Sequence, residues 1–79
     1  MDNEIAIKIK GKNRYSIQGE NGIYRKLKGE YKGYEVYAEV DDSFQGDIGL
    51  PQFILINEKE KEKRYNHQGN EWADLMNKL

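Results

Sequence analysis

The clearest strand signal in this sequence is the stretch at residues 4–10, which reads EIAIKIK. Ile5, Ile7 and Ile9 fall on one face of such a strand, and the charged residues of the stretch fall on the other. A period of two carried by β-branched residues is typical of a half-buried strand. We therefore expect a β-rich fold in which these three isoleucines are buried.

Further strand segments follow along the chain, separated by turns rich in Gly and Asn. They are residues 14–18, 23–28, 34–40, 52–57 and 62–66. In the first of them Tyr15 and Ile17 should point inward. The facing of the segment at 23–28 is unclear, because Leu27 and Arg25 share one parity. Either Arg25 lies at a sheet edge or a β-bulge resets the register.

The last ten residues change period and predict a helix. Asn70 can cap its N-terminus, and Glu71 suits the first turn of the helix dipole. Apolar residues then recur at i, i+3, i+4 and i+7. They are Trp72, Leu75, Met76 and Leu79. A helix of about ten residues is marginal alone, so we expect it to pack on the inner face of the sheet, with Trp72 between them.

These elements predict a single domain over residues 1–79 with an α+β fold. An antiparallel meander sheet of about five or six strands should curl into an open, barrel-like shape, with the C-terminal amphipathic helix packed on it. Besides the isoleucines, the expected core holds Val36, Ala38, Trp72, Leu75 and Met76. From the apolar run at 53–56 it holds Phe53 or Ile54, and Leu55 or Ile56.

The composition excludes several classes of protein. With no cysteine in 79 residues, the chain has no disulfides, no thiol catalysis and no cysteine-bound zinc. The longest apolar run, at 53–56, is far shorter than the ~20 residues of a membrane span. The N-terminus does not resemble a signal peptide. We therefore expect a cytoplasmic protein without a membrane partner.

Charge is distributed unevenly along the chain. Residues 1–33 carry eight basic and four acidic residues, whereas residues 34–57 carry five acidic residues and no Lys or Arg. Such asymmetry can steer a partner of opposite charge. It is also explained by basic and acidic strands that lie side by side and pair across the sheet.

The candidates for chemistry are few. His67 is the one histidine, and no second catalytic or metal-binding group accompanies it in the sequence, so we interpret it as a turn residue. Asp41, Asp42 and Asp47 do not match the spacing of a calcium loop. We expect no catalytic residue, no metal and no cofactor, and hence no enzyme.

Two groups of residues form the candidate binding surface. The first interleaves tyrosines with lysines, which suits a protein interface or the stacking of single-stranded nucleic acid, although tyrosine is also common in ordinary strands. The second belongs to an irregular loop at 41–51, since loops often carry binding residues. The candidates are Tyr24, Lys26, Lys28, Tyr31 and Tyr37 in the first group, and Asp42, Phe44 and Asp47 in the second.

The sequence thus favours a small non-enzymatic protein-binding module, such as an inhibitor, an immunity-type protein or an accessory subunit. The alternative is a small β-barrel that binds single-stranded nucleic acid through tyrosines and lysines. A pI near 5.8 weakens the alternative, because nucleic-acid-binding domains usually have a pI above ~9.

Overall fold

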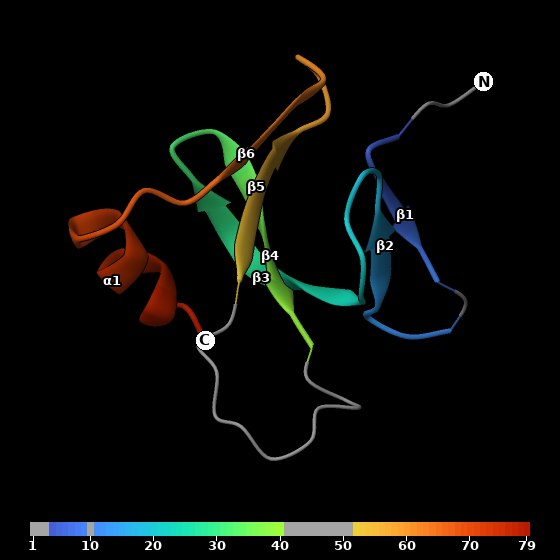
Figure 1. Cartoon of the computed structure of the whole chain (residues 1–79), viewed down its shortest axis with the longest axis horizontal. Helices are drawn as coiled ribbons and strands as arrows, with labels where there is room; N and C mark the ends of the chain where they lie inside the picture. The colour runs from blue at the N-terminus through green and yellow to red at the C-terminus, as the bar shows by residue number, and fades with distance from the viewer. Residues whose placement is uncertain (1–3, 10, 41–51) are drawn as a thin grey trace.

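The computed structural model describes residues 4–9, 11–40 and 52–79, which form a curled antiparallel sheet and one helix (Figure 1). The elements are β1 (Ala6–Lys8), β2 (Tyr15–Ile17), β3 (Tyr24–Tyr31), β4 (Tyr34–Glu39), β5 (Phe53–Asn57), β6 (Glu62–Tyr65) and α1 (Asn70–Met76). The six strands follow one another in the sheet in chain order, as in a meander. The predicted α+β fold, a half-barrel with a short C-terminal helix, is confirmed.

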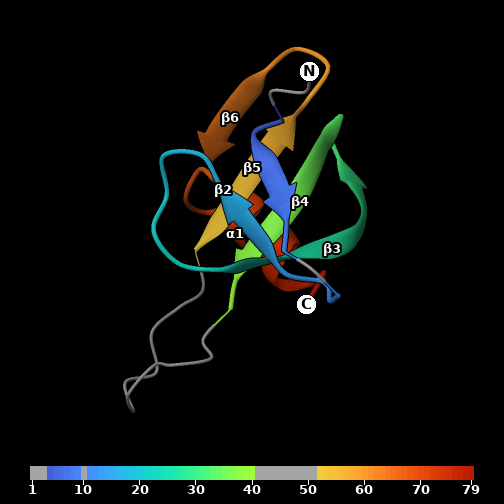
Figure 2. The ribbon, with the colours of Figure 1, turned by 90° about the vertical axis from the view of Figure 1, so that its right-hand side faces the viewer.

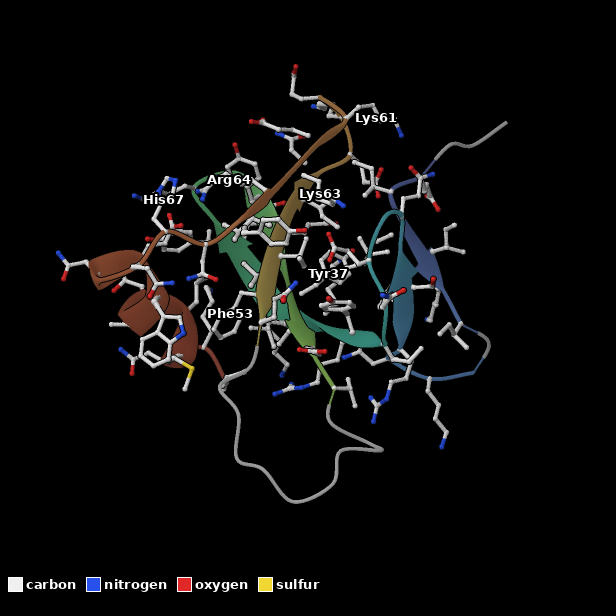
Figure 3. All side chains as sticks on the ribbon, in the orientation of Figure 1. Tyr37, Phe53, Lys61, Lys63, Arg64 and His67 are labelled. Atoms are coloured by element: carbon white, nitrogen blue, oxygen red, sulfur yellow. The ribbon has the colours of Figure 1, made fainter. Side chains whose placement is uncertain are left out.

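Strand β5 lies at the centre of the molecule and is covered on both faces. Its residues Phe53, Ile54, Leu55 and Ile56 are all 0% exposed. Because side chains alternate along a strand, Phe53 and Leu55 face α1, whereas Ile54 and Ile56 face the β1–β2 hairpin. Figure 3 shows Phe53 on the helix side of the sheet.

The two faces of the sheet carry two separate cores. On the hairpin side the buried residues are Ile5, Ala6, Ile17, Tyr24, Tyr37, Ile54 and Ile56. On the helix side they are Leu27, Val36, Ala38, Phe53, Leu55 and Leu75. In Figure 2 the β1–β2 hairpin lies in front of the central strands, and α1 lies behind them.

These two cores explain why the sequence did not show which side chains of β3 face inward. Tyr24 packs into the hairpin-side core and Leu27 into the helix-side core, so both parities of β3 are buried. The register against β4 shifts between Lys26 and Glu30, which is the bulge that the sequence left open. The strand continues to Tyr31, beyond the predicted boundary.

The expected burial of two isoleucines is wrong. Ile7 and Ile9 are 51% and 37% exposed, whereas Ile5 and Ala6 are buried. The chain bends at Ile5, and the small Ala6 faces the hairpin-side core. Alternation shows which side chains share a face, but the bend decides which face is covered.

The helix also differs from the prediction. Gly69, with φ 85°, stands at the N-cap in place of Asn70, and no side chain caps the helix. Glu71 and Leu75 face the sheet, Trp72 and Met76 are half-buried, and Leu79 is exposed. The helix packs on the outer face of the sheet because the hairpin already covers the inner face.

Within the described ranges, no helix is long and apolar enough to cross a membrane.

Candidate functional site

The tyrosines at the centre of the predicted surface are structural. Tyr24 and Tyr37 are only 1% and 3% exposed, so their expected place on the surface is wrong. The Tyr24 hydroxyl accepts a hydrogen bond from Gln52 at 3.3 Å, and burial raises its pKa to about 12. The Tyr37 hydroxyl donates to Glu35 at 3.3 Å, and burial again raises its pKa. Both rings serve the hairpin-side core.

The other candidates of the first group are not brought together. Lys26 is half-buried on the hairpin side, with its Nζ 3.1 Å from a carboxylate oxygen of Glu35. Tyr31 packs against the helix-side core and donates to Asp74 of α1 at 3.1 Å. Lys28 is exposed on β3.

The second group, Asp42, Phe44 and Asp47, lies outside the described residues, as does the loop at 41–51 that contains it.

The two edges of the sheet differ in how they are protected. Strand β6 reads EKRY, and charged side chains of this kind discourage the pairing of further strands. Lys63 and Arg64 of β6 are also engaged in ion pairs with Glu20 and Glu71. Strand β1 reads AIK and forms the opposite edge.

Within the described ranges, the backbone of β1 has free hydrogen-bonding capacity along its outer side. Hydrogen bonds from Gln18 N–H to Ile5 C=O and from Ile9 N–H to Arg14 C=O show that the odd-numbered residues pair with β2. The N–H and C=O groups of Ala6 and Lys8 therefore point away from β2. Within the described residues no strand pairs with this side of β1.

The side chains of Ile7 and Ile9 add apolar surface to this edge. They project from the face of the hairpin opposite to Ala6, and both are exposed. An edge strand with open backbone groups and exposed branched residues is a template on which another strand can pair. The edge of β1 is therefore the candidate binding site.

Of two adjoining cavities, the first is lined by residues of this edge. This cavity, of about 340 Å³, is lined by Ala6 and Lys8 of β1, by Tyr15 and Tyr37, and by Glu4, Lys26, Glu35 and Glu58. The other, of about 300 Å³, shares Glu35 and Glu58 with the first. A strand added to β1 would project alternate side chains toward the first cavity and toward Ile7 and Ile9.

Glu58 fixes β1 in place from the β5–β6 turn. Its carboxylate accepts hydrogen bonds from the N–H groups of Ile5 and Ala6, all at 3.0 Å. Burial raises the pKa of Glu58, but the N–H groups of Ala6 and Ile5, together with Lys61, outweigh it and hold the pKa below its ordinary value. Ala6 therefore has its N–H engaged, while no group in the described part of the chain bonds its C=O.

Further polar contacts hold the other parts of the hairpin. The Asn13 side chain bonds both the C=O and the N–H of Lys26, each at 3.1 Å, and so extends the short β2–β3 pairing. Lys63 of β6 donates to Gln18 C=O at 2.7 Å and to Glu20 at 2.9 Å. These contacts attach the hairpin to β3 and β6.

The site was missed in the sequence because its signal resembles that of a core strand. Ile7 and Ile9 carry the alternation that normally marks burial. The one available clue was that Lys8 and Lys10 alternate with the isoleucines in the sequence, because lysines also occur at sheet edges.

Within the described residues, no group of three or more His, Asp or Glu side chains is placed to hold a metal ion. His67 lies just before α1, and its backbone N–H donates to Glu71 at 2.7 Å. Comparisons with protein-family models, with curated proteins and with solved structures find no match to this chain.

Proposed function

We propose that this chain is a small non-enzymatic protein-binding module that takes up an extended segment of another protein on the open edge of β1. The observation that carries the proposal is that no described residue bonds the backbone groups of Lys8, while the side chains of Ile7 and Ile9 beside it are exposed. In β-strand addition, main-chain hydrogen bonds supply affinity and alternate side chains supply specificity. An inhibitor, an immunity-type protein or an accessory subunit, working in the cytoplasm, would use such an edge.

The structure weakens the nucleic-acid alternative. Stacking on bases needs exposed aromatic faces, and Tyr24 and Tyr37 are buried. Tyr31 is partly covered by the helix-side core. The tyrosines and lysines of the predicted surface thus form no continuous track for a strand of nucleic acid.

Selection from a library of displayed random peptides tests the proposal. The immobilised wild-type protein should enrich peptides that no longer bind Lys8→Pro. Proline at this position removes only an N–H that points away from β2, and proline is tolerated on the outer side of an edge strand. Ile7→Lys should also abolish binding, because it replaces the apolar contact surface by a charge.

Leu79→Lys is the matched control, since Leu79 is an exposed apolar residue of the C-terminal tail, outside β1. This variant should retain every selected peptide. Thermal unfolding of each variant establishes that the fold is kept. The proposal is wrong if no peptide is enriched, or if the enriched peptides bind Lys8→Pro and Ile7→Lys as tightly as wild type.

A further inference from the structure

Lys8 sets the register of any strand that pairs with β1. Its N–H and C=O both point to the open edge, so an antiparallel partner residue opposite Lys8 exchanges two hydrogen bonds with it. The next partner residues on either side lie opposite Ile7 and Ile9. These are non-hydrogen-bonded pairs, in which the facing side chains are closest.

A second copy of this chain is a poor occupant of the edge. A symmetric antiparallel pairing of residues 6–8 has three registers. In two of them Ala6 lies opposite Ala6 or opposite Lys8 of the other copy. Both of these registers require the Ala6 N–H, which already donates to Glu58 at 3.0 Å. The third sets Lys8 directly opposite Lys8, and like charges in that position are destabilising.

Lys8 and neighbouring Lys26 differ in their ion pairs. Within the described residues, no carboxylate forms an ion pair with Lys8, whereas neighbouring Lys26 is paired with Glu35 at 3.1 Å. Residues 8–14 contain four basic residues and no acidic one. The cavity that Lys8 lines also holds the carboxylates of Glu4, Glu35 and Glu58, but Glu35 already pairs with Lys26, and Glu58 is engaged by Lys61 and by the N–H groups of Ile5 and Ala6. An acidic side chain of a partner, placed opposite Lys8, would therefore lie beside the lining lysine that has no ion pair within the described residues.

We propose that the segment bound by β1 carries an apolar–acidic–apolar triplet, with the acidic residue opposite Lys8 and the apolar residues against Ile7 and Ile9. This inference rests on the proposed function and specifies its partner. The acidic side chain points toward the cavity that Lys8 lines, and the two apolar side chains extend the exposed isoleucine surface.

A charge exchange between two peptides and two proteins tests the triplet. The peptides are identical extended segments with valines on either side of a central Glu or a central Lys, and the proteins are wild type and Lys8→Glu. Wild type should bind the Glu peptide at least about fivefold more tightly than the Lys peptide. Lys8→Glu should reverse the preference, as measured by fluorescence anisotropy with labelled peptides. Lys28→Glu, which changes an exposed lysine outside both cavities, should keep the wild-type preference.

The outcomes separate this inference from the proposed function. If wild type binds the two peptides equally and Lys8→Pro binds neither, the binding edge is supported and the acidic preference is refuted. The same holds if neither peptide binds while library peptides still bind β1. If no peptide depends on β1, both proposals fail.

Discussion

Glu71 is a charged side chain that the fold buries, with 8% of the residue exposed. The two guanidinium nitrogens of Arg64 donate to its two oxygens at 2.8 and 3.1 Å, and Arg64 also stacks on the ring of Tyr34 at 4.8 Å. Figure 3 shows Arg64 and His67 close to the start of α1. Hydrogen bonding by Arg64 lowers the pKa of Glu71 to about 2. One residue thus joins the helix to β6.

Glu71→Gln should therefore destabilise the protein by about 1–3 kcal/mol, because a charge-assisted pair is replaced and Arg64 is left without its counter-charge. Urea unfolding at neutral pH measures the loss. Glu60→Gln, an exposed change in the β5–β6 turn, is the control and should have little effect. Equal unfolding midpoints for the two variants would contradict the structural role of Glu71.

At the residue scale, the sequence predicts which residues are buried better than it predicts which side chains contact one another. Val36, Ala38 and Leu75 are buried as expected, whereas all four residues at 53–56 are buried although only one of each neighbouring pair was expected to be. Glu71 was expected only to favour the helix dipole, because nothing in the sequence pairs it with Arg64. Side-chain pairs between elements depend on how those elements pack, which local patterns do not encode.

At the scale of elements, the β1–β2 hairpin is held by side-chain contacts rather than by a continuous ladder. Its pairing with β3 has a single Cα partner pair, Tyr15 and Tyr24. Glu58, in the β5–β6 turn, supplies a further contact by accepting the backbone N–H groups of Ile5 and Ala6. The hairpin should therefore open more readily than the strands at the centre.

Glu58→Ala should raise the hydrogen-exchange rates of the β1–β2 amides by about tenfold or more, since charge-assisted hydrogen bonds are lost. Amides of β4 and β5 should exchange as in wild type. Glu60→Ala in the same turn is the control. Uniform acceleration over all strands would show instead that the hairpin opens only with the whole protein.

The helix gives a second prediction at this scale. Leu75 is 0% exposed and reaches the helix-side core, whereas Trp72 only packs at its margin. Leu75→Ala should cost about 2–5 kcal/mol, and Leu79→Ala, at an exposed position, should cost little. Urea unfolding followed by Trp72 fluorescence compares them. A larger loss for Leu79→Ala would overturn the assigned orientation of the helix.

The order of the elements was predictable, and their layering was not. Strand positions and the terminal helix follow from the periodicity of the sequence. The sequence does not say that the hairpin would cover the inner face and leave only the outer face for α1. That choice depends on the curl of the whole sheet, which also decides that Ile7 and Ile9 are exposed.

At the scale of the whole molecule, three glutamates connect segments that are distant in the sequence. Glu58 holds β1, Glu20 contacts Lys63 and Tyr65 of β6, and Glu71 contacts Arg64. Burial raises the pKa of Glu20, but its hydrogen bonds to Tyr65 and Lys63 outweigh it, so the pKa lies below its ordinary value. All three carboxylates thus have lowered pKa values in the folded protein.

Stability should therefore decrease as the pH falls from the ordinary glutamate pKa of 4.5 toward the pKa of about 2 at Glu71. In this range the unfolded chain binds more protons than the folded protein, so acid favours unfolding. Urea midpoints measured from neutral pH down to pH ~3 test this. The triple substitution of these glutamates by glutamine should flatten the dependence, and a wild-type midpoint that does not change with pH would contradict it.

The outward side chains of β1 have a consequence for how this protein can evolve. Ile7 and Ile9 belong to neither core and are exposed, so replacing them costs little folding free energy. Descendants of one ancestral gene can therefore diverge at positions 7 and 9 while they keep the same scaffold. Selection for a new partner and selection for a stable fold then act on different residues, and recognition can change without compensating mutations in the interior.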